Sequence, residues 1–136
     1  MRSATRPLPS TRDRLLSIAH VVDSASADLT GARIVSVELD GDDVVLGVRD
    51  LPAGVHPVGP LAGLVAPEQW WALCIVTHGR AHFLDEPDRA PEDIVSTFAL
   101  ARDGSEASLL RRGDDVMELP GPTTGRIPDL LRTILG

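Results

Sequence analysis

The residues of this 136-residue chain best suited to chemistry gather between positions 66 and 85, in the stretch APEQWWALCIVTHGRAHFLD. This stretch holds both tryptophans, the only cysteine and two of the four histidines. His78 and His82 have a spacing that on a helix would place two imidazoles on one face, as in some zinc sites. Arg80, between them, could pair with an anionic ligand through its planar guanidinium.

The zinc interpretation is opposed by the residues around the two histidines, which favour strands over a helix. Gly79 lies inside the spacing, and the pattern predicts a hairpin with His78 at its turn and His82 on the returning strand. The fold would have to supply a third ligand from His56, His20 or Asp85. We therefore expect a pair of exposed or hydrogen-bonded histidines, with no bound metal and no other cofactor.

The cysteine and the tryptophans have simpler interpretations as core residues. Cys74 lies in the most apolar run of the chain, where a free cysteine is usually buried and unreactive. Trp70 and Trp71 must point in different directions if the second begins a strand. Trp70 then either anchors a partner or ligand at the rim, or closes one end of the core against the loop at 50–66.

Local catalytic motifs are missing from the sequence. It contains no G-x-S-x-G, no G-x-x-x-x-G-K-[ST], no H-E-x-x-H, and no H-x-E combined with P-C-x-x-C. A catalytic triad scattered along the sequence stays open. We assign no catalytic residue, and the chain is more naturally a binding protein than an enzyme.

Composition narrows the class of protein further. The hydrophobic fraction is 43% and aromatic residues make up 3%, so the core must be built from Val, Leu, Ile and Ala. A net charge of −7 repels phosphate backbones and disfavours nucleic-acid binding. No stretch approaches the ~18 apolar residues of a membrane-spanning helix, and residues 1–10 lack the apolar block of a secretory signal. We expect a cytoplasmic protein without a membrane or nucleic-acid partner.

The basic residues carry a compositional bias. All 13 are arginine, and lysine, asparagine and tyrosine are absent. The codons of these three absent residues are AT-rich, so the bias indicates a GC-rich genome. We expect most of the arginines to be ordinary solvated charges.

The sequence predicts a disordered tail at 1–10 and a single α+β domain at 11–136. A helix begins at Ser10 or Thr11 and ends near Thr30-Gly31. Alternating β-branched residues predict strands at 33–39 and 43–49, joined as a hairpin by Asp40-Gly41-Asp42.

The second half of the chain is dominated by strands. Residues 50–66 are irregular, with one helical turn, and 85–93 form an acidic loop. The expected strands cover 71–77, 80–84, 94–101, 106–112 and 116–119. Ile127, Leu130, Leu131 and Ile134 follow at helical spacing behind Pro128.

These elements predict an antiparallel sheet of about five to seven strands built from hairpins, packed by an N-terminal and a C-terminal amphipathic helix. We expect both helices on one face, which leaves the other face open to solvent or to a partner. In outline this order is similar to profilin-like or roadblock-like folds, an analogy that carries no function.

Three segments together resemble a group of small actinobacterial proteins of unknown function. They are APEQWWALCIVTHGRAHFLD, ARDGSEASLLRRGDD and the ending GRIPDLLRTILG, so the resemblance covers roughly residues 60–136. It implies a bacterial, cytoplasmic protein and transfers no activity or residue role.

Two functions follow as hypotheses. The first is a non-catalytic binding or assembly module with free sheet edges or an open sheet face, of which a homodimer is the simplest version. The second is a small-ligand sensor or an enzyme, with a pocket near Trp70, His56, His78 and Arg80. Its candidate ligand- or partner-binding residues are these four together with His82.

Overall fold

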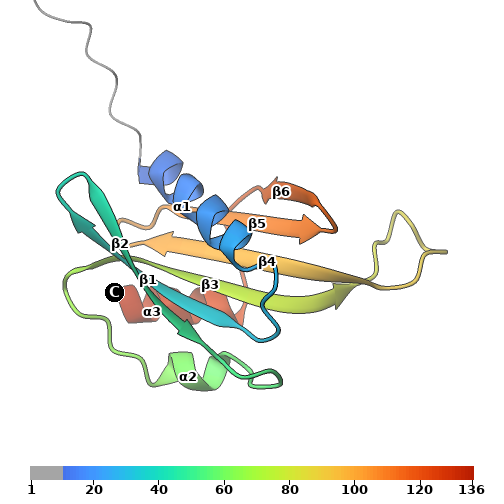
Figure 1. The fold of residues 1–136 in the computed structure, drawn as a ribbon, viewed down its shortest axis with the longest axis horizontal. Helices are drawn as coiled ribbons and strands as arrows, with labels where there is room; N and C mark the ends of the chain where they lie inside the picture. Colours follow the sequence, from blue (N-terminus) through green and yellow to red (C-terminus); the bar gives the residue numbers. More distant parts are fainter. Residues whose placement is uncertain (1–10) are drawn as a thin grey trace, which may run out of the picture.

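A computed structural model of the protein describes residues 11–136, and its six strands form one antiparallel sheet with helices on both faces (Figure 1). The elements in chain order are α1 (Thr11–Ala25), β1 (Arg33–Asp40), β2 (Asp43–Asp50), α2 (Val58–Ala62), β3 (Trp70–Ala81), β4 (Glu92–Ala101), β5 (Glu106–Arg112), β6 (Asp115–Leu119) and α3 (Arg126–Leu135). Across the sheet the order is β2-β1-β3-β4-β5-β6, with every neighbouring pair antiparallel. The predicted α+β class and its terminal helices are confirmed, while the tail at 1–10 lies outside the described residues.

Helix α1 ends before Thr30-Gly31, where the sequence predicts its end. Its last residue is Ala25, and the Ser26 hydroxyl donates to the Val22 carbonyl at 2.7 Å. Arg33 Nη1, at the start of β1, donates to the Ala25 carbonyl at 3.1 Å. A cation that bonds a terminal carbonyl stabilises a helix end, so Arg33 of the following strand stabilises the end of α1.

The first hairpin forms as predicted. Residues 41 and 42 make a two-residue turn, and Gly41 has a φ of 61°, which glycine adopts without the steric cost of a Cβ. The register then pairs each residue of β1 with one of β2, from Asp40 opposite Asp43 to Arg33 opposite Asp50. No bulge interrupts this ladder.

The predicted turn at His78-Gly79 is wrong, and so is the returning strand at 80–84. β3 continues to Ala81, and its ladder with β4 includes Gly79 opposite Ile94 and Ala81 opposite Glu92. Gly79 has no positive φ and stays in the ladder, because a glycine permits a turn without requiring one. His82 consequently lies after β3, in the loop at 82–91, and not on a returning strand.

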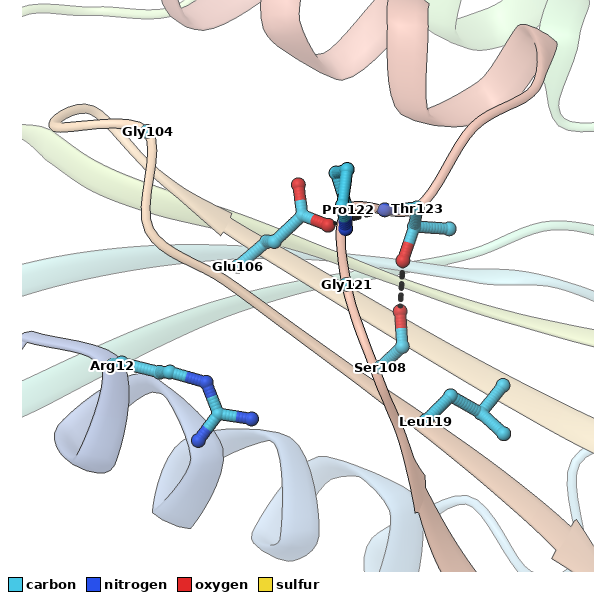
Figure 2. Close-up of a pocket in the computed structure, with 8 residues that line it drawn as sticks. All are labelled: Arg12, Gly104, Glu106, Ser108, Leu119, Gly121, Pro122 and Thr123. Atoms are coloured by element: carbon cyan, nitrogen blue, oxygen red, sulfur yellow. Dashed lines mark hydrogen bonds between the residues drawn. The ribbon is translucent and has the colours of Figure 1, made fainter.

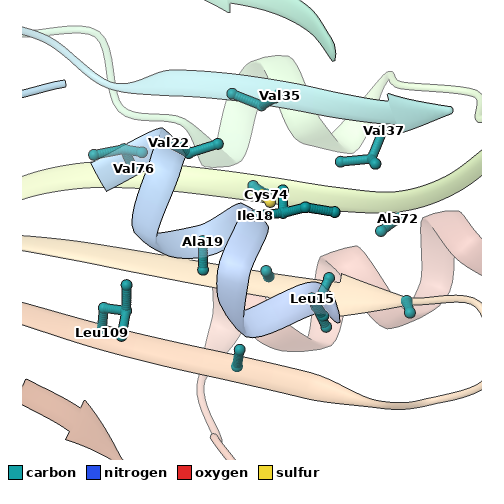
Figure 3. Packing of buried hydrophobic residues seen from close by; sticks show 13 residues of the cluster. Leu15, Ile18, Ala19, Val22, Val35, Val37, Ala72, Cys74, Val76 and Leu109 are labelled. Carbon is teal, nitrogen blue, oxygen red and sulfur yellow. The ribbon is translucent and has the colours of Figure 1, made fainter. Parts of the chain in front are cut away.

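The two faces of the sheet carry separate apolar clusters, so the expectation that both terminal helices share one face is also wrong. Under α1 lie Ala72, Cys74 and Val76 of β3, with Val35 and Val37 of β1 (Figure 3). The alternate β3 residues Leu73 and Ile75 pack on the opposite face with residues of α2 and α3. The continuous apolar run in β3 follows from this arrangement, since a strand covered on both faces has no polar side.

Candidate interaction surface

Strand β2 forms one edge of the sheet, and each of its eight residues is exposed. Its central segment 44–48 reads VVLGV and contains no charge. Val44, Leu46 and Val48 lie opposite Leu39, Val37 and Val35 of β1 and share their face, the face that carries α1. They nevertheless keep 37%, 36% and 57% of their surface exposed, because α1 packs over β3, β4 and β5. The apolar face of the sheet therefore extends past the helix that covers it.

A groove of about 390 Å³ lies between α1 and this uncovered part of β2. Its lining includes Ile18 and Val21 from the helix and Val44 and Leu46 from the strand. Val21 is 60% exposed and extends the exposed apolar surface from the strand onto the helix. The groove and the β2 segment 44–48 together form what we call the β2 surface.

The central segment 44–48 of the β2 edge lacks the usual protections against pairing with another chain, since the charges of the strand lie at its ends. Native edge strands are commonly short, bulged, or interrupted by proline or inward-pointing charge. β2 is eight residues long, pairs without a bulge and contains no proline or lysine. The opposite edge, β6, is only five residues long and carries the exposed Glu118 near its centre. The two edges of one sheet thus differ in how readily they accept a further strand.

The three residues of the His-Arg-His stretch do not converge. Arg80 donates to the Pro91 carbonyl at 3.4 Å and lies 3.6 Å from the Asp93 carboxylate, with its side chain 70% exposed. The His82 Nε2 lies 3.1 Å from the Pro87 carbonyl. Both side chains therefore contact the loop that joins β3 to β4. His78 lies two residues before Arg80 on β3 and lines a different part of the surface.

His56 and His78 are the two predicted site residues that the fold brings together. Both line a pocket of about 240 Å³, whose other walls come from the segments 30–32 and 54–57 and from Thr77. The His56 Nδ1 accepts a hydrogen bond from the Val58 backbone N–H at 3.2 Å, which leaves its Nε2 to carry the ring proton in the neutral form. Apart from the two histidines, the residues that line the pocket are all small.

Trp70 lies at the other end of β3 and belongs to the core on the α2 and α3 side. The β1–β3 register shifts beside it, and Trp71 packs on the α1 side, so the two indoles do point in different directions. Arg102 fixes this corner by donating to the Trp70, Pro67 and Leu135 carbonyls at 2.5, 2.8 and 2.9 Å. Of the two roles considered for Trp70, an anchor for a partner and a side chain that closes one end of the core, this packing favours the second.

Cys74 is fully buried beneath α1, and burial raises the pKa of its thiol to about 12. The thiol is therefore protonated at neutral pH and shielded from reagents, as the sequence predicted.

A further pocket of about 370 Å³ lies where β5 meets the segment before α3, and three of its lining residues, Glu106, Ser108 and Thr123, bond to each other. The Ser108 and Thr123 hydroxyls are 2.8 Å apart (Figure 2). Glu106 accepts hydrogen bonds from the Thr123 N–H and from Arg132 of α3, the latter at 2.9 Å. These contacts tie α3 to β5, so these polar groups help to hold the fold together.

The sequence predicted the hairpin but not which strand would be left uncovered. β1 and β2 show the same alternation of apolar residues, and what separates them is the pairing of β1 with β3, which leaves β2 at the edge. Among residues 11–136, no group of three or more His, Cys, Asp or Glu side chains is placed to hold a metal ion. Within the same residues, no helix has the length and apolar character needed to span a membrane.

No protein-family model, curated protein or solved structure matches the chain.

Proposed function

We propose that this protein is a non-catalytic interaction module that assembles through the β2 surface, with self-association as its simplest form. The observation that carries the proposal is an eight-residue edge strand, exposed along its whole length, beside an apolar groove. The composition and the resemblance described above favour the bacterial cytoplasm as the place where it acts.

Addition of a strand is the binding mode that suits this surface. An incoming extended segment would satisfy the backbone N–H and C=O groups at the free edge and cover the side chains that project beside α1. Full burial of a Val or Leu side chain contributes roughly 1.5–3 kcal/mol, and each of the three partly exposed side chains would contribute a fraction of that. The backbone ladder would supply affinity, and the side chains Val44, Leu46 and Val48 would supply specificity.

The small-ligand hypothesis has less support. Its candidate residues divide among three places, with His56 and His78 at one pocket, Trp70 packed against the core and Arg80 beside the loop at 82–91. Only the first pair shares a cavity. The β2 surface, in contrast, is continuous and is built from adjacent residues.

The proposed function can be tested by photo-crosslinking in the native host. We would place benzoylphenylalanine at Val48 on the β2 surface and, as a matched control, at Leu84, which is an exposed apolar residue in the loop at 82–91. The expected result is a covalent adduct from position 48 alone, with mass spectrometry locating the linked partner peptide. The adduct should disappear with Leu46→Glu, which puts a charge into the apolar strip.

Two outcomes would count against an interaction module of this kind. One is the absence of any adduct specific to position 48. The other is an adduct that persists in the Leu46→Glu protein, since binding would then not depend on the β2 surface.

A further inference from the structure

The backbone geometry of β2 determines which residues could bond a new strand. In a two-residue hairpin the residues flanking the turn face each other through their N–H and C=O groups, and this orientation alternates along the ladder. Asp43, Val45, Gly47 and Arg49 therefore direct their backbone groups toward β1. Val44, Leu46 and Val48 direct theirs toward the open edge.

A second copy of β2 could pair there only in a limited set of registers. A two-fold axis perpendicular to the sheet keeps each side chain on its own face, so residues that face each other must be an even number of positions apart. The axis must then pass midway between the two copies of one residue, which we describe as an axis through that residue. The central candidates are Val45, Leu46 and Gly47. Each choice places different charges opposite each other.

The axis through Leu46 gives the best complementarity. It sets Leu46 opposite Leu46 and Val44 opposite Val48, so the apolar strips coincide. It also sets Asp43 of each copy opposite Arg49 of the other, which forms two ion pairs of opposite charge at the ends of the apolar segment. With the axis through Val45, Asp43 would face Gly47; through Gly47, Arg49 would face Val45.

One less favourable contact accompanies this register. Asp42, in the turn, comes opposite Asp50 of the other copy. Within its own chain, however, the Asp50 carboxylate accepts hydrogen bonds from Arg33 at 2.5 and 3.0 Å. This contact keeps the pKa of Asp50 below its ordinary value and compensates its charge, which limits the repulsion.

We infer that the β2 edge binds the β2 edge of a second copy of this chain, antiparallel and with Leu46 on the two-fold axis. The inference rests on the proposed function and names its partner. The resulting dimer has one continuous sheet through both copies, with both α1 helices on the same face. Its two grooves open toward a shared apolar strip made of Val44, Leu46 and Val48 from each chain.

Cysteine pairing tests the register in the purified full-length protein. Residues directly opposite in a hydrogen-bonded pair have Cα atoms about 5.5 Å apart, which suits a disulfide, whereas a shift of two residues does not. Under mild oxidation Leu46→Cys should form a disulfide-linked dimer. Val44→Cys and Val48→Cys should each stay largely unlinked alone and become linked when mixed. Leu84→Cys is the exposed control, and the buried Cys74 does not interfere.

Charge exchange tests the same register without any covalent bond. Light scattering at tens of micromolar should find a dimer for the natural sequence. Asp43→Arg or Arg49→Asp alone should each weaken dimerisation about tenfold, because two cross-strand contacts change from attraction to repulsion. The double variant, which exchanges the two charges, should restore the natural affinity to within about threefold.

The outcomes separate this inference from the proposed function. A strict monomer at all concentrations overturns the inference, while a specific adduct to another polypeptide in the photo-crosslinking experiment would leave the proposed function standing. A dimer without the mixed 44–48 linkage, or without rescue by charge exchange, overturns the pairing with Leu46 on the axis. A dimer with both supports it.

Discussion

Arg111 of β5 and Asp23 of α1 form an ion pair that fixes the helix to the sheet. The Arg111 Nη2 donates to the Asp23 Oδ2 at 2.5 Å, and the Asp23 side chain is 1% exposed while that of Arg111 is 21% exposed. A buried carboxylate without its partner is strongly unfavourable, whereas a partly exposed guanidinium can turn toward water. The two partners should therefore differ in how much their removal costs.

We predict that Arg111→Ala lowers the free energy of unfolding by about 3–5 kcal/mol and that Asp23→Ala lowers it by less. Urea unfolding followed by circular dichroism would measure both changes, with the double variant as the control. Because the double variant leaves no unpaired charge, its loss should be smaller than the sum of the single losses. Equal losses for the two single variants would show that burial of the carboxylate is not the dominant effect.

Ion pairs between residues far apart in the sequence, such as that of Arg111 with Asp23, cannot be predicted from the sequence alone. Arg111 and Asp23 are 88 positions apart, and no local pattern connects them. From the sequence we expect most arginines to be solvated charges. Five of them nevertheless bond to an element in which they do not themselves lie: Arg33, Arg102, Arg111, Arg112 and Arg132. By contrast, the burial of Cys74 was predictable, because its neighbours in the chain are apolar.

At the scale of elements, the loop at 82–91 is held by Arg112 at the end of β5. Arg112 donates to Glu86 at 2.5 Å and to Glu92 at 2.6 Å, and its guanidinium carbon lies 3.9 Å from the centre of the Phe83 ring. The guanidinium lowers the pKa of both glutamates below the ordinary value of 4.5, mainly through these hydrogen bonds. The loop is acidic, as predicted, but it is anchored to the sheet by this contact.

We predict that this anchor is complete at neutral pH and is lost in acid. A carboxylate with a lowered pKa in the folded state stabilises the structure above its unfolded pKa and loses that contribution as pH falls through the folded value. Fluorine NMR of fluorophenylalanine-labelled protein would follow the change at Phe83, with the buried Phe98 as internal reference. The Phe83 resonance should shift as pH falls below 4.5, and in the Arg112→Ala protein it should start near the shifted position. A Phe83 resonance that stays constant down to the pH of global unfolding would contradict the anchor.

The strands themselves were largely predictable, because alternating or continuous apolar residues mark both hairpins and the central strand. The length of β3 was not. Gly79 beside a histidine is compatible with either a turn or a strand, and its pairing with Ile94 of β4 is what extends β3 to Ala81. Local composition contains no information on this pairing.

At the scale of the whole molecule, the sheet is covered on both faces at its centre and uncovered at one side. The sequence predicts both terminal helices on one face, whereas α1 and α3 cover opposite faces, and this arrangement accounts for the apolar residues on both sides of β3. The possibility of a free sheet edge follows from the hairpins alone, whereas the choice of β2 follows from the pairing of β1 with β3, which leaves β2 at the edge. The account of function depends on that choice.

The most direct measurement is the hydrogen exchange of individual β2 amides in the purified protein as its concentration is raised. If two β2 edges pair, the outward-facing amides of Val44, Leu46 and Val48 become protected with increasing concentration. The amides of Val45 and Gly47, which face β1 within each chain, keep the same protection throughout and serve as the control. Fast exchange at the three outward amides at every concentration would contradict pairing through this edge.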